Sequence, residues 1–167
     1  MPMVELSQRV EVAINEQGLI PEGGRVVVAL SGGGDSVALA SLMCEMSAMA
    51  SWSVVGFLHI NHQLRAGAVG DETFCRKLAH AFDVPILVEH SDVRECARVE
   101  RVSIEEAGHR LRYGAFARAV TSGSADLVAT AHTLDDLAET VLLRLIRGAG
   151  PGGLAGIRPR MGNVIRP

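Results

Sequence analysis

The sequence predicts an α/β fold of the doubly wound type, with a mainly parallel sheet and helices on both faces. Short continuous apolar runs, which are typical of strands buried on both faces, alternate along the chain with longer segments of helical period. Since 48% of the 167 residues are hydrophobic and only 4% aromatic, the core of this one domain must consist of Val, Leu, Ile and Ala. Right-handed crossovers then bring the carboxyl ends of the strands to one edge, where such folds bind ligands.

Apolar periodicity and capping residues place the elements in order. The expected helices are 4–17, 36–49, 71–82, 103–120 and 134–147, and the expected strands are 26–30, 54–60, 85–88 and 127–131. The fourth helix is entered through the capping box Ser103-x-x-Glu106, and the last has Thr133 as its N-cap and Gly148 beyond its end. The segment 148–167 is rich in Gly and Pro, and we expect it to be irregular.

The first predicted strand ends at the turn Ser31-Gly32-Gly33-Gly34-Asp35-Ser36, and a helix follows near Asp35 or Ser36. Glycines lack a Cβ, so they can adopt positive φ and let an anionic group approach the backbone closely. The first N–H groups of the following helix, together with its dipole, point into the same space. The turn is therefore predicted to bind phosphate; the alternative is a strand-to-helix turn that is glycine-rich without a ligand.

Two familiar glycine motifs do not fit this turn. A kinase-type P-loop needs Gly-Lys-Ser or Gly-Lys-Thr, and neither occurs in the chain. The dinucleotide fingerprint needs a third glycine where the chain has Val37. A formal match at Gly148, Gly150 and Gly153 follows a predicted helix rather than a strand, so we interpret it as a chance match.

Two further polar segments follow predicted strands. In His59-Ile-Asn61-His62, strand alternation sends His59 and Asn61 to one side and Ile60 and His62 to the other. Without a third ligand a transition-metal site is not expected here. We expect His59 and Asn61 to recognise the adenine or ribose of a nucleotide, although a pair of histidines is more often structural.

The second polar segment, 132–140, follows the fourth predicted strand and opens a helix. His132 and the adjacent acids Asp135 and Asp136 could hold Mg²⁺, orient a nucleotide or accept a proton. The helix dipole alone explains part of this pattern, because acids are common in the first turn of a helix. It does not explain His132.

The predicted helix 103–120 places His109, Arg112 and Tyr113 within one turn of each other. Arg112 could clamp a phosphate through two hydrogen bonds. The alternative is a solvated arginine paired with Glu105 or Glu106.

Charge and cysteine usage narrow the class of protein. Residues 141–167 contain five arginines and no Asp or Glu, a pattern suited to contact with a phosphate backbone, although Arg144 and Arg147 could simply complement a helix end. Cys44, Cys75 and Cys96 are isolated and are expected to be buried thiols rather than disulfide or zinc ligands. No apolar run approaches the roughly 18 residues of a membrane span and the N-terminus lacks a signal pattern, so no membrane association and a cytoplasmic location are expected.

The turn 31–36 resembles the Ser-Gly-Gly-x-Asp-Ser loop of the N-type ATP pyrophosphatases, or PP-loop enzymes, which binds the pyrophosphate end of ATP. Three further segments resemble the tRNA(Ile)-lysidine synthetases: His-x-Asn-His-x-Leu-Arg at 59–65, Arg-Tyr at 112–113, and 131–144 continuing into Arg147-Gly-Ala-Gly. The resemblance covers most residues from 25 to 167. His109 stands where that family commonly has Arg, which puts a second guanidinium clamp on this helix in doubt.

The resemblance implies that residues 1–167 form a PP-loop domain. Family members continue with C-terminal tRNA-binding domains, so the chain is expected to be a fragment truncated at its C-terminal end. It implies ligation of free L-lysine to C2 of the wobble cytidine of tRNA(Ile) with a CAU anticodon, through an adenylated tRNA, with ATP as co-substrate and AMP and pyrophosphate as products. A homodimer is also an expected assembly.

The implied site residues fall into two groups. The ATP-binding residues are Ser31, Gly32, Gly33, Gly34, Asp35, Ser36, His59 and Asn61, with Mg²⁺ near Asp35. The catalytic residues are Asp35, Arg112, His132 and Asp136, with His132 or Asp136 accepting the proton of the lysine amine.

Two other functions remain as hypotheses. A PP-loop tRNA thiolase would be expected to carry Lys in the loop and paired cysteines, whereas this chain has Gly34 and three isolated cysteines. A non-catalytic nucleotide-binding module would bind ATP without releasing pyrophosphate.

Overall fold

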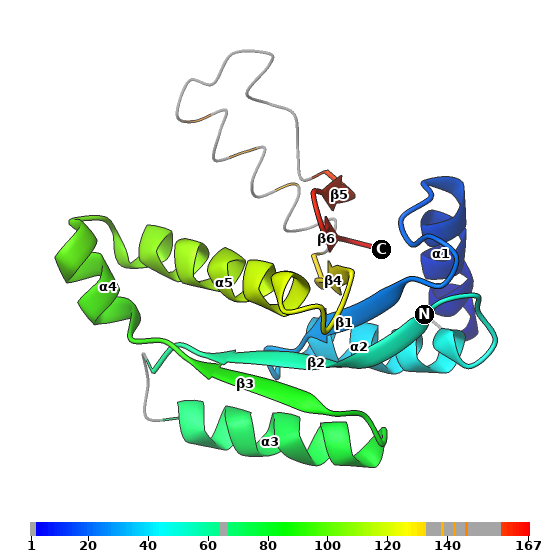
Figure 1. Cartoon of the computed structure of the whole chain (residues 1–167), viewed down its shortest axis with the longest axis horizontal. Helices are drawn as coiled ribbons and strands as arrows, with labels where there is room; N and C mark the ends of the chain where they lie inside the picture. The colour runs from blue at the N-terminus through cyan, green and yellow to red at the C-terminus, as the bar shows by residue number, and fades with distance from the viewer. Residues whose placement is uncertain (1–2, 64–66, 133–137, 139–141, 143–145, 147–157) are drawn as a thin grey trace.

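The structure is a computed structural model that describes residues 3–63, 67–132, 138, 142, 146 and 158–167. The strands are β1 (Arg25–Ala29), β2 (Ser53–Asn61), β3 (Ile86–His90), β4 (Leu127–Ala129), β5 (Arg160–Met161) and β6 (Val164–Ile165). The helices that lie wholly within the described residues are α1 (Met3–Glu16), α2 (Gly34–Ser47), α3 (Ala68–Ala81), α4 (Val93–Glu100) and α5 (Ile104–Thr121). Figure 1 shows their arrangement.

The strands form one sheet in the order β3-β2-β1-β4-β6-β5. All neighbouring pairs are parallel except β5 and β6, which are antiparallel. From β1 the chain builds outward through β2 and β3, then returns to the other side of β1 with β4. This reversal makes the carboxyl ends of β1 and β4 the switch point, where doubly wound sheets open a crevice for ligands.

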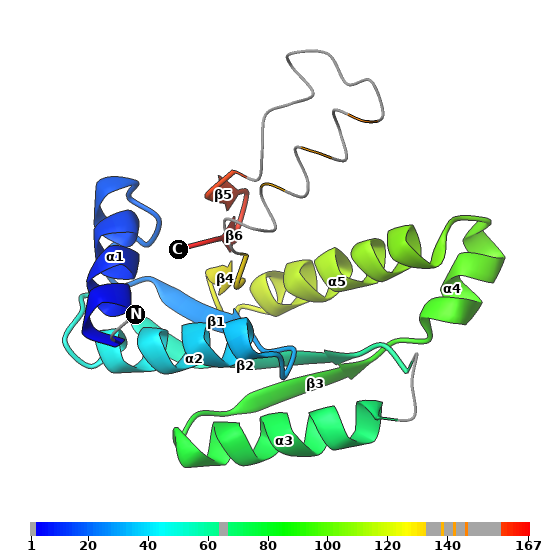
Figure 2. The same ribbon diagram turned by 180° about the vertical axis from the view of Figure 1, so that it is seen from behind.

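Helices cover both faces of the sheet, as the sequence predicts. The first buried cluster, under α2 and α3, includes Val26, Val28, Leu39, Met43 and Cys75, and the second, under α5, includes Val27, Leu58, Phe116, Ala119 and Val128. Since successive residues of β1 belong to opposite clusters, both of its faces are buried. Figures 1 and 2 show α3 and α5 on opposite sides of β2 and β3 from two directions.

Most of the predicted elements are confirmed, with boundary shifts of one to three residues. The predicted cap of α5 is confirmed, because the Ser103 hydroxyl accepts a hydrogen bond of 3.0 Å from the Glu106 N–H. The Glu106 carboxylate, however, binds Arg110 at 2.6 Å. The predicted helix 134–147 lies largely outside the described residues, although Ala138, Leu142 and Ile146 are helical.

One helix and one hairpin of two strands were not predicted. The short helix α4 has Asp92 as its N-cap and buries Val93 and Ala97 against Ala107 of α5. The expectation of irregular structure is wrong for β5 and β6, because pairing with β4 (Val128 with Val164) extends the sheet by a hairpin. The two strands of the hairpin are too short to produce a periodic signal, whereas α4 is amphipathic, so the prediction missed a signal that the sequence carries.

The cysteines lie on three separate helices. Cys75 is fully buried as expected, whereas Cys44 and Cys96 are only partly buried, so the expectation of buried thiols is wrong in degree for those two.

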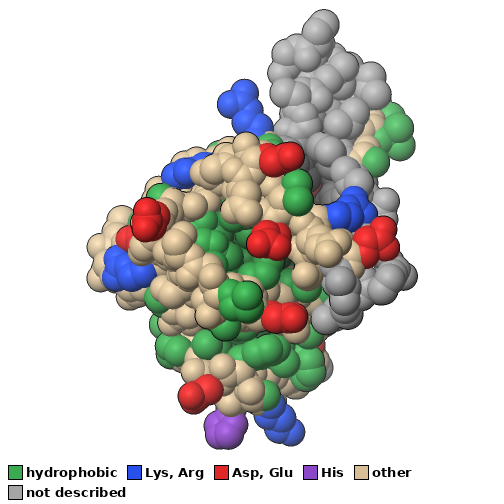
Figure 3. Space-filling view, turned by 90° about the vertical axis from the view of Figure 1, so that its right-hand side faces the viewer, with side chains coloured by type: hydrophobic (Ala, Val, Ile, Leu, Met, Phe, Trp, Pro, Cys, Tyr) green, Lys and Arg blue, Asp and Glu red, His purple; other side chains and the backbone are tan. Residues whose placement is uncertain are grey.

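Figure 3 shows the end of the molecule that carries α1, where acidic and basic side chains are scattered singly around hydrophobic ones. Among the described helices none is long and apolar enough to span a membrane.

A candidate nucleotide-binding site at the carboxyl edge of the sheet

A cavity of about 530 Å³ opens at the switch point between β1 and β4. Its walls come from 29–36 after β1, 58–63 at the end of β2, 130–132 after β4, and positions on α3 and α5. The cavity brings together eight of the residues predicted from the sequence, which are Gly33 and the side chains of Ser31, Asp35, Ser36, His59, Asn61, Arg112 and His132. Gly32 and Gly34 belong to the same turn as Gly33, and Asp136 lies outside the described residues.

The turn 31–36 has the backbone that the glycines were predicted to allow. Gly32 has φ +89°, in the region that residues with a Cβ avoid, and Gly33 is extended at φ −76°, ψ 156°. Helix α2 begins at Gly34 without a side-chain cap hydrogen bond. An anion can therefore take the place of a capping side chain at the first N–H groups of α2.

The two serines of the turn hold its shape. The Ser36 hydroxyl donates to the Gly33 carbonyl at 2.8 Å and accepts from the Ser31 N–H at 3.2 Å. The two hydroxyls are themselves 3.0 Å apart, and the Gly33 N–H donates to Ser31 Oγ at 3.3 Å. These bonds prearrange the turn before any ligand arrives. The predicted contact of the serines with ATP stays a prediction.

His59 presents an unused nitrogen at the cavity wall. The residue is 3% exposed, and its Nδ1 lies 2.8 Å from the carbonyl oxygen of Leu30. Because a carbonyl only accepts, Nδ1 carries a proton, and in the neutral imidazole Nε2 keeps a lone pair. Nε2 is buried and has no hydrogen-bond partner among the described residues. The site therefore offers a fixed acceptor for a hydroxyl or amino group of a ligand.

The predicted alternation along β2 is confirmed. Asn61 points toward α3 and Ile60 packs in the cluster under α5. His62 lies on the α5 side, where burial, the charge of Arg112 and then His59 lower the pKa of its imidazole, so it is held neutral.

A comparison with protein families identifies the domain. The model of one family, described as the PP-loop domain, matches residues 3–167. The chain belongs to the PP-loop domain family.

Curated relatives of this PP-loop domain include two tRNA(Ile)-lysidine synthases. That of Thermosipho africanus is 38% identical over 165 residues, covering 99% of this chain and 38% of the relative, and that of Geobacter sulfurreducens is 39% identical over 169 residues, covering 99% and 36%. The chain thus spans less than two fifths of the length of these relatives.

Solved structures share the fold of this PP-loop domain at low sequence identity. The U34-tRNA thiolase NcsA of Methanococcus maripaludis superposes with a TM-score of 0.75 at 18% identity, covering 98% of this chain and 58% of that one. The NH3-dependent NAD synthetase of Campylobacter jejuni gives 0.59 at 18% identity, covering 93% and 65%. At this identity the likeness supports the fold alone, and it agrees with the predicted class.

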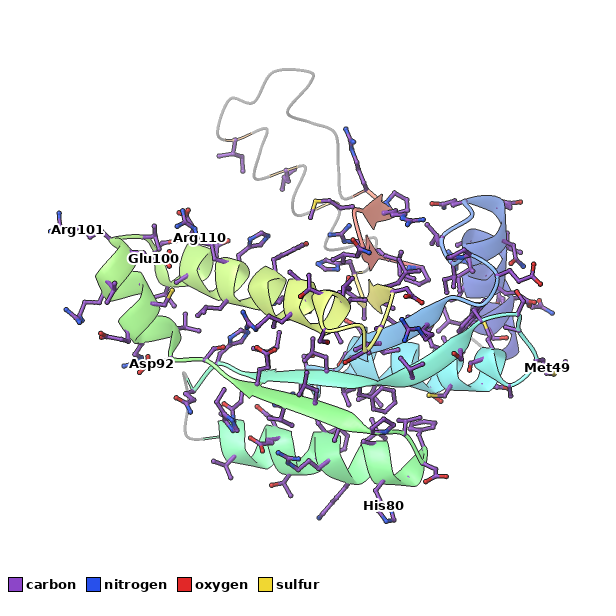
Figure 4. All side chains as sticks on the ribbon, in the orientation of Figure 1. Met49, His80, Asp92, Glu100, Arg101 and Arg110 are labelled. Carbon is purple, nitrogen blue, oxygen red and sulfur yellow. The ribbon has the colours of Figure 1, made fainter. Side chains whose placement is uncertain are left out.

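In the PP-loop domain Arg112 is a cavity residue. The alternative pairing with Glu106 belongs instead to its neighbour Arg110, which contacts Glu106 at 2.6 Å and Glu100 at 2.8 Å where α4 meets α5 (Figure 4). Arg112 lines the cavity beside Phe116, one turn further along α5. Its predicted contact with a phosphate of a ligand stays a prediction.

His132, which follows β4, is held by hydrogen bonds to Thr130 at the end of the same strand. Nδ1 of His132 lies 3.0 Å from the Thr130 hydroxyl, and the backbone N–H of His132 donates to the Thr130 carbonyl at 3.1 Å. The Thr130 N–H in turn donates to Ile165 of β6 at 2.9 Å. The unpredicted hairpin thus supports the position of His132.

Sequence reasoning missed Glu72 of α3, which organises the end of β2. Its carboxylate accepts from Asn61 at 3.1 Å, from Arg76 at 2.8 Å and lies 2.9 Å from His90 Nε2. Hydrogen bonds from Asn61 and Arg76, followed by His90, lower the pKa of Glu72 to about 2. Asn61 Oδ1 accepts from the N–H of Gln63, which has φ +53°. The i,i+4 spacing predicts only the pair with Arg76, whereas Asn61 and His90 come from two strands and are brought to Glu72 by the fold.

Asn61 therefore contributes to the cavity wall while its amide is bonded within the protein. The Nδ2 group donates to Glu72 and, at 3.4 Å, to the Ala68 carbonyl. Oδ1 accepts a hydrogen bond from the N–H of Gln63. The predicted contact of Asn61 with a nucleotide is untested by these bonds and stays a prediction.

Asp71 of α3 also lines the cavity and was not singled out from the sequence. With Asp35 it supplies two carboxylates. No group of three or more His, Cys, Asp or Glu side chains able to hold a metal occurs in the described part of the chain. A Mg²⁺ ion bound through one or two carboxylates and substrate phosphates fits this donor set; a structural transition-metal site does not.

Proposed function

We propose that this PP-loop domain carries the active site of a tRNA(Ile)-lysidine synthase. The reaction is ATP-dependent ligation of free L-lysine to C2 of the wobble cytidine of tRNA(Ile) with a CAU anticodon, through an adenylated tRNA intermediate. The observation that carries the proposal is the cavity at the switch point, where the phosphate-binding turn faces Arg112 and His132. The names of the relatives, which are similar over nearly the whole of this chain, support the choice of substrate.

The first step is transfer of AMP to the cytidine. The turn 31–36 and the N-terminus of α2 bind the β- and γ-phosphates, and His59 accepts a hydrogen bond from the nucleoside part of ATP. O2 of the cytidine attacks the α-phosphorus, the bond to the β-phosphate oxygen breaks, and pyrophosphate leaves. Arg112 stabilises the negative charge that develops on the transferred phosphate.

A Mg²⁺ ion would be held by Asp35, with Asp71 at the same cavity, and by phosphate oxygens. When bound it would neutralise phosphate charge during the departure of pyrophosphate.

The second step joins lysine to the base. The lysine ε-amine attacks C2 of the adenylated cytidine and expels AMP, which requires the amine to lose a proton. His132 or Asp136 accepts this proton. His132 is fixed by Thr130 at the cavity, which suits a group that must meet an amine in one orientation.

The thiolase hypothesis has less support. The thiolase NcsA shares the fold at 18% identity, whereas the three cysteines of this chain lie apart on α2, α3 and α4. The non-catalytic hypothesis predicts ATP binding without turnover, and it is distinguished by experiment.

The test measures pyrophosphate release from ATP with tRNA(Ile) present, with and without lysine, and detects lysidine in the tRNA by mass spectrometry. Lysidine that forms only with ATP and lysine supports the proposal. Asp35→Asn and Asp136→Ala should each reduce its formation at least tenfold, whereas Asp83→Asn, an exposed residue with φ +53° that asparagine tolerates, should not.

Pyrophosphate release without lysidine formation, or sulfur transfer to the tRNA, would refute the proposed reaction. Full activity of Asp136→Ala would refute only its role as proton acceptor.

A further inference from the structure

Three aromatic rings lie in sequence along one face of α5. The imidazole of His109 stacks on Tyr113 with ring centroids 4.4 Å apart and an interplanar angle of 29°. Tyr113 packs in turn against Phe116 at 5.5 Å, tilted by 60°. Since Phe116 and Arg112 line the cavity, this row of rings runs from the cavity to the surface.

The burial of the rings decreases in the same direction. Phe116 is 3% exposed, Tyr113 is partly buried in the same core cluster, and His109 is exposed. Within the described part of the chain, stacking on Tyr113 is the one ring contact recorded for the imidazole. An anchored tyrosine therefore supports an imidazole whose outer face is open to solvent.

A guanidinium group lies at the edge of these rings. Arg166, which directly follows β6, donates from Nη2 to the Tyr113 hydroxyl at 2.8 Å and from Nη1 to the Arg158 carbonyl at 2.6 Å. In the described structure no carboxylate pairs with Arg166. Glu106, an acid on α5, is already paired with Arg110. The surface formed by His109, Tyr113 and Arg166 is thus aromatic and cationic.

This combination is the chemistry that recognises unpaired RNA. Splayed-out bases of single-stranded loops stack on aromatic side chains, including histidine, while arginine meets the phosphate backbone. A double helix would not need an exposed ring, since its bases are already stacked.

We propose that His109, Tyr113 and Arg166 form a platform on which an unpaired base of the RNA substrate stacks, next to the cytidine that enters the cavity. The inference rests on the proposed function in assigning the partner as a tRNA anticodon loop. The geometry requires a loop nucleotide adjacent to the reacting cytidine, because His109 lies one turn of α5 away from the cavity residue Arg112.

Binding of an anticodon stem-loop RNA, with 2-aminopurine beside the target cytidine, tests the platform. Stacking quenches the fluorescence of the probe, so the wild type should bind and quench. His109→Ala should weaken binding by about 5- to 100-fold, the range expected for loss of one stacked base, and should abolish the quenching. His109→Phe, which keeps a ring on Tyr113, should retain both.

The matched control is His80→Ala, which removes an exposed imidazole from α3, on the other side of the sheet from α5 (Figure 4). It should bind as the wild type does. ATP affinity and the melting temperature should be unchanged in all three variants, which separates loss of the platform from loss of the fold.

Equal RNA binding by His109→Ala and the wild type would overturn the proposal, as would equal loss in His109→Phe, which would indicate a polar role for the imidazole. Absence of RNA binding by the wild type would overturn it too. If binding depends on the ring at 109 but no lysidine forms, the platform stands and the proposed reaction fails.

Discussion

Replacing Gly32 by alanine should destabilise the protein by imposing a Cβ on the one residue of the turn 31–36 that has positive φ. At φ +89° a residue with a Cβ is strained by about 1–2 kcal/mol. Space is not the limitation, because the new Cβ would lie 3.6 Å from Cys75 Sγ and 3.8 Å from the Phe74 ring, at ordinary contact distances. The expected loss of stability is therefore conformational and about 1–2 kcal/mol.

Thermal unfolding without nucleotide measures this loss directly. For a domain of this size 1 kcal/mol corresponds to roughly 2–4 °C, so Gly32→Ala should lower the melting temperature by about 2–8 °C. Omitting ATP isolates the backbone effect from any clash between a Cβ and a bound phosphate.

The neighbouring glycines are matched controls. Gly34 is the first residue of α2 and its Cβ would meet nothing within 4 Å, so Gly34→Ala should be neutral or stabilise by up to about 1 kcal/mol. Gly33 has φ −76°, and its Cβ would lie 3.5 Å from Ser31 Oγ, so alanine there should change little.

Two results would refute the reasoning. An unchanged melting temperature for Gly32→Ala would show that the turn accepts a side chain at this φ. A fall for Gly34→Ala as large as that for Gly32→Ala would show that the turn needs glycines for another reason.

Three further predictions concern stability and reactivity. The pKa of Glu72 is about 2 in the folded protein and 4.5 ordinarily, so its hydrogen bonds stabilise the fold above pH 4.5 and lose this contribution as the pH falls toward 2. Urea unfolding at a series of pH values should show this loss, and the free energy of unfolding of Glu72→Gln should depend less on pH. Burial, with the charges of Asp71 and Glu72, raises the pKa of Cys75 to about 11, so below pH 8 a disulfide reagent should label it only after unfolding. Phe57 is 1% exposed and packs edge-on against Phe82, with ring centroids 6.0 Å apart. Phe57→Ala should therefore lower the free energy of unfolding by about 3–5 kcal/mol, as measured by urea unfolding.

Each of these has an outcome that contradicts it. A Glu72→Gln profile as steep as that of the wild type would assign the acid sensitivity to other carboxyl groups. Rapid labelling of native Cys75 at pH 7 would mean that the thiol is not held under the turn. A loss below about 1 kcal/mol for Phe57→Ala would mean that the core around β2 collapses to fill the space.

Much of the fold was predicted from the sequence, because strands, turns and helix caps depend on residues that are neighbours in the chain. The apolar run before Ser31 and the glycines after it predicted the β1–turn–α2 unit, and the hydroxyl of Ser103 predicted the start of α5. Helix α4 and the β5–β6 hairpin escaped prediction. The hairpin depends on pairing with β4, which is distant in the sequence, and the apolar face of α4 is stable only when it packs against Ala107 of α5.

The sequence by itself determined the chemistry available at the site: glycines that admit positive φ, an open helix N-terminus, and histidines at strand ends. Only the tertiary structure decided how these groups are used. It showed that Arg112 rather than Arg110 lines the cavity, that His59 Nε2 has no hydrogen-bond partner among the described residues, and that Glu72 occupies the amide of Asn61. The physical reason is that hydrogen-bond partners and burial come from parallel strands and helices far apart along the chain, which no single segment encodes.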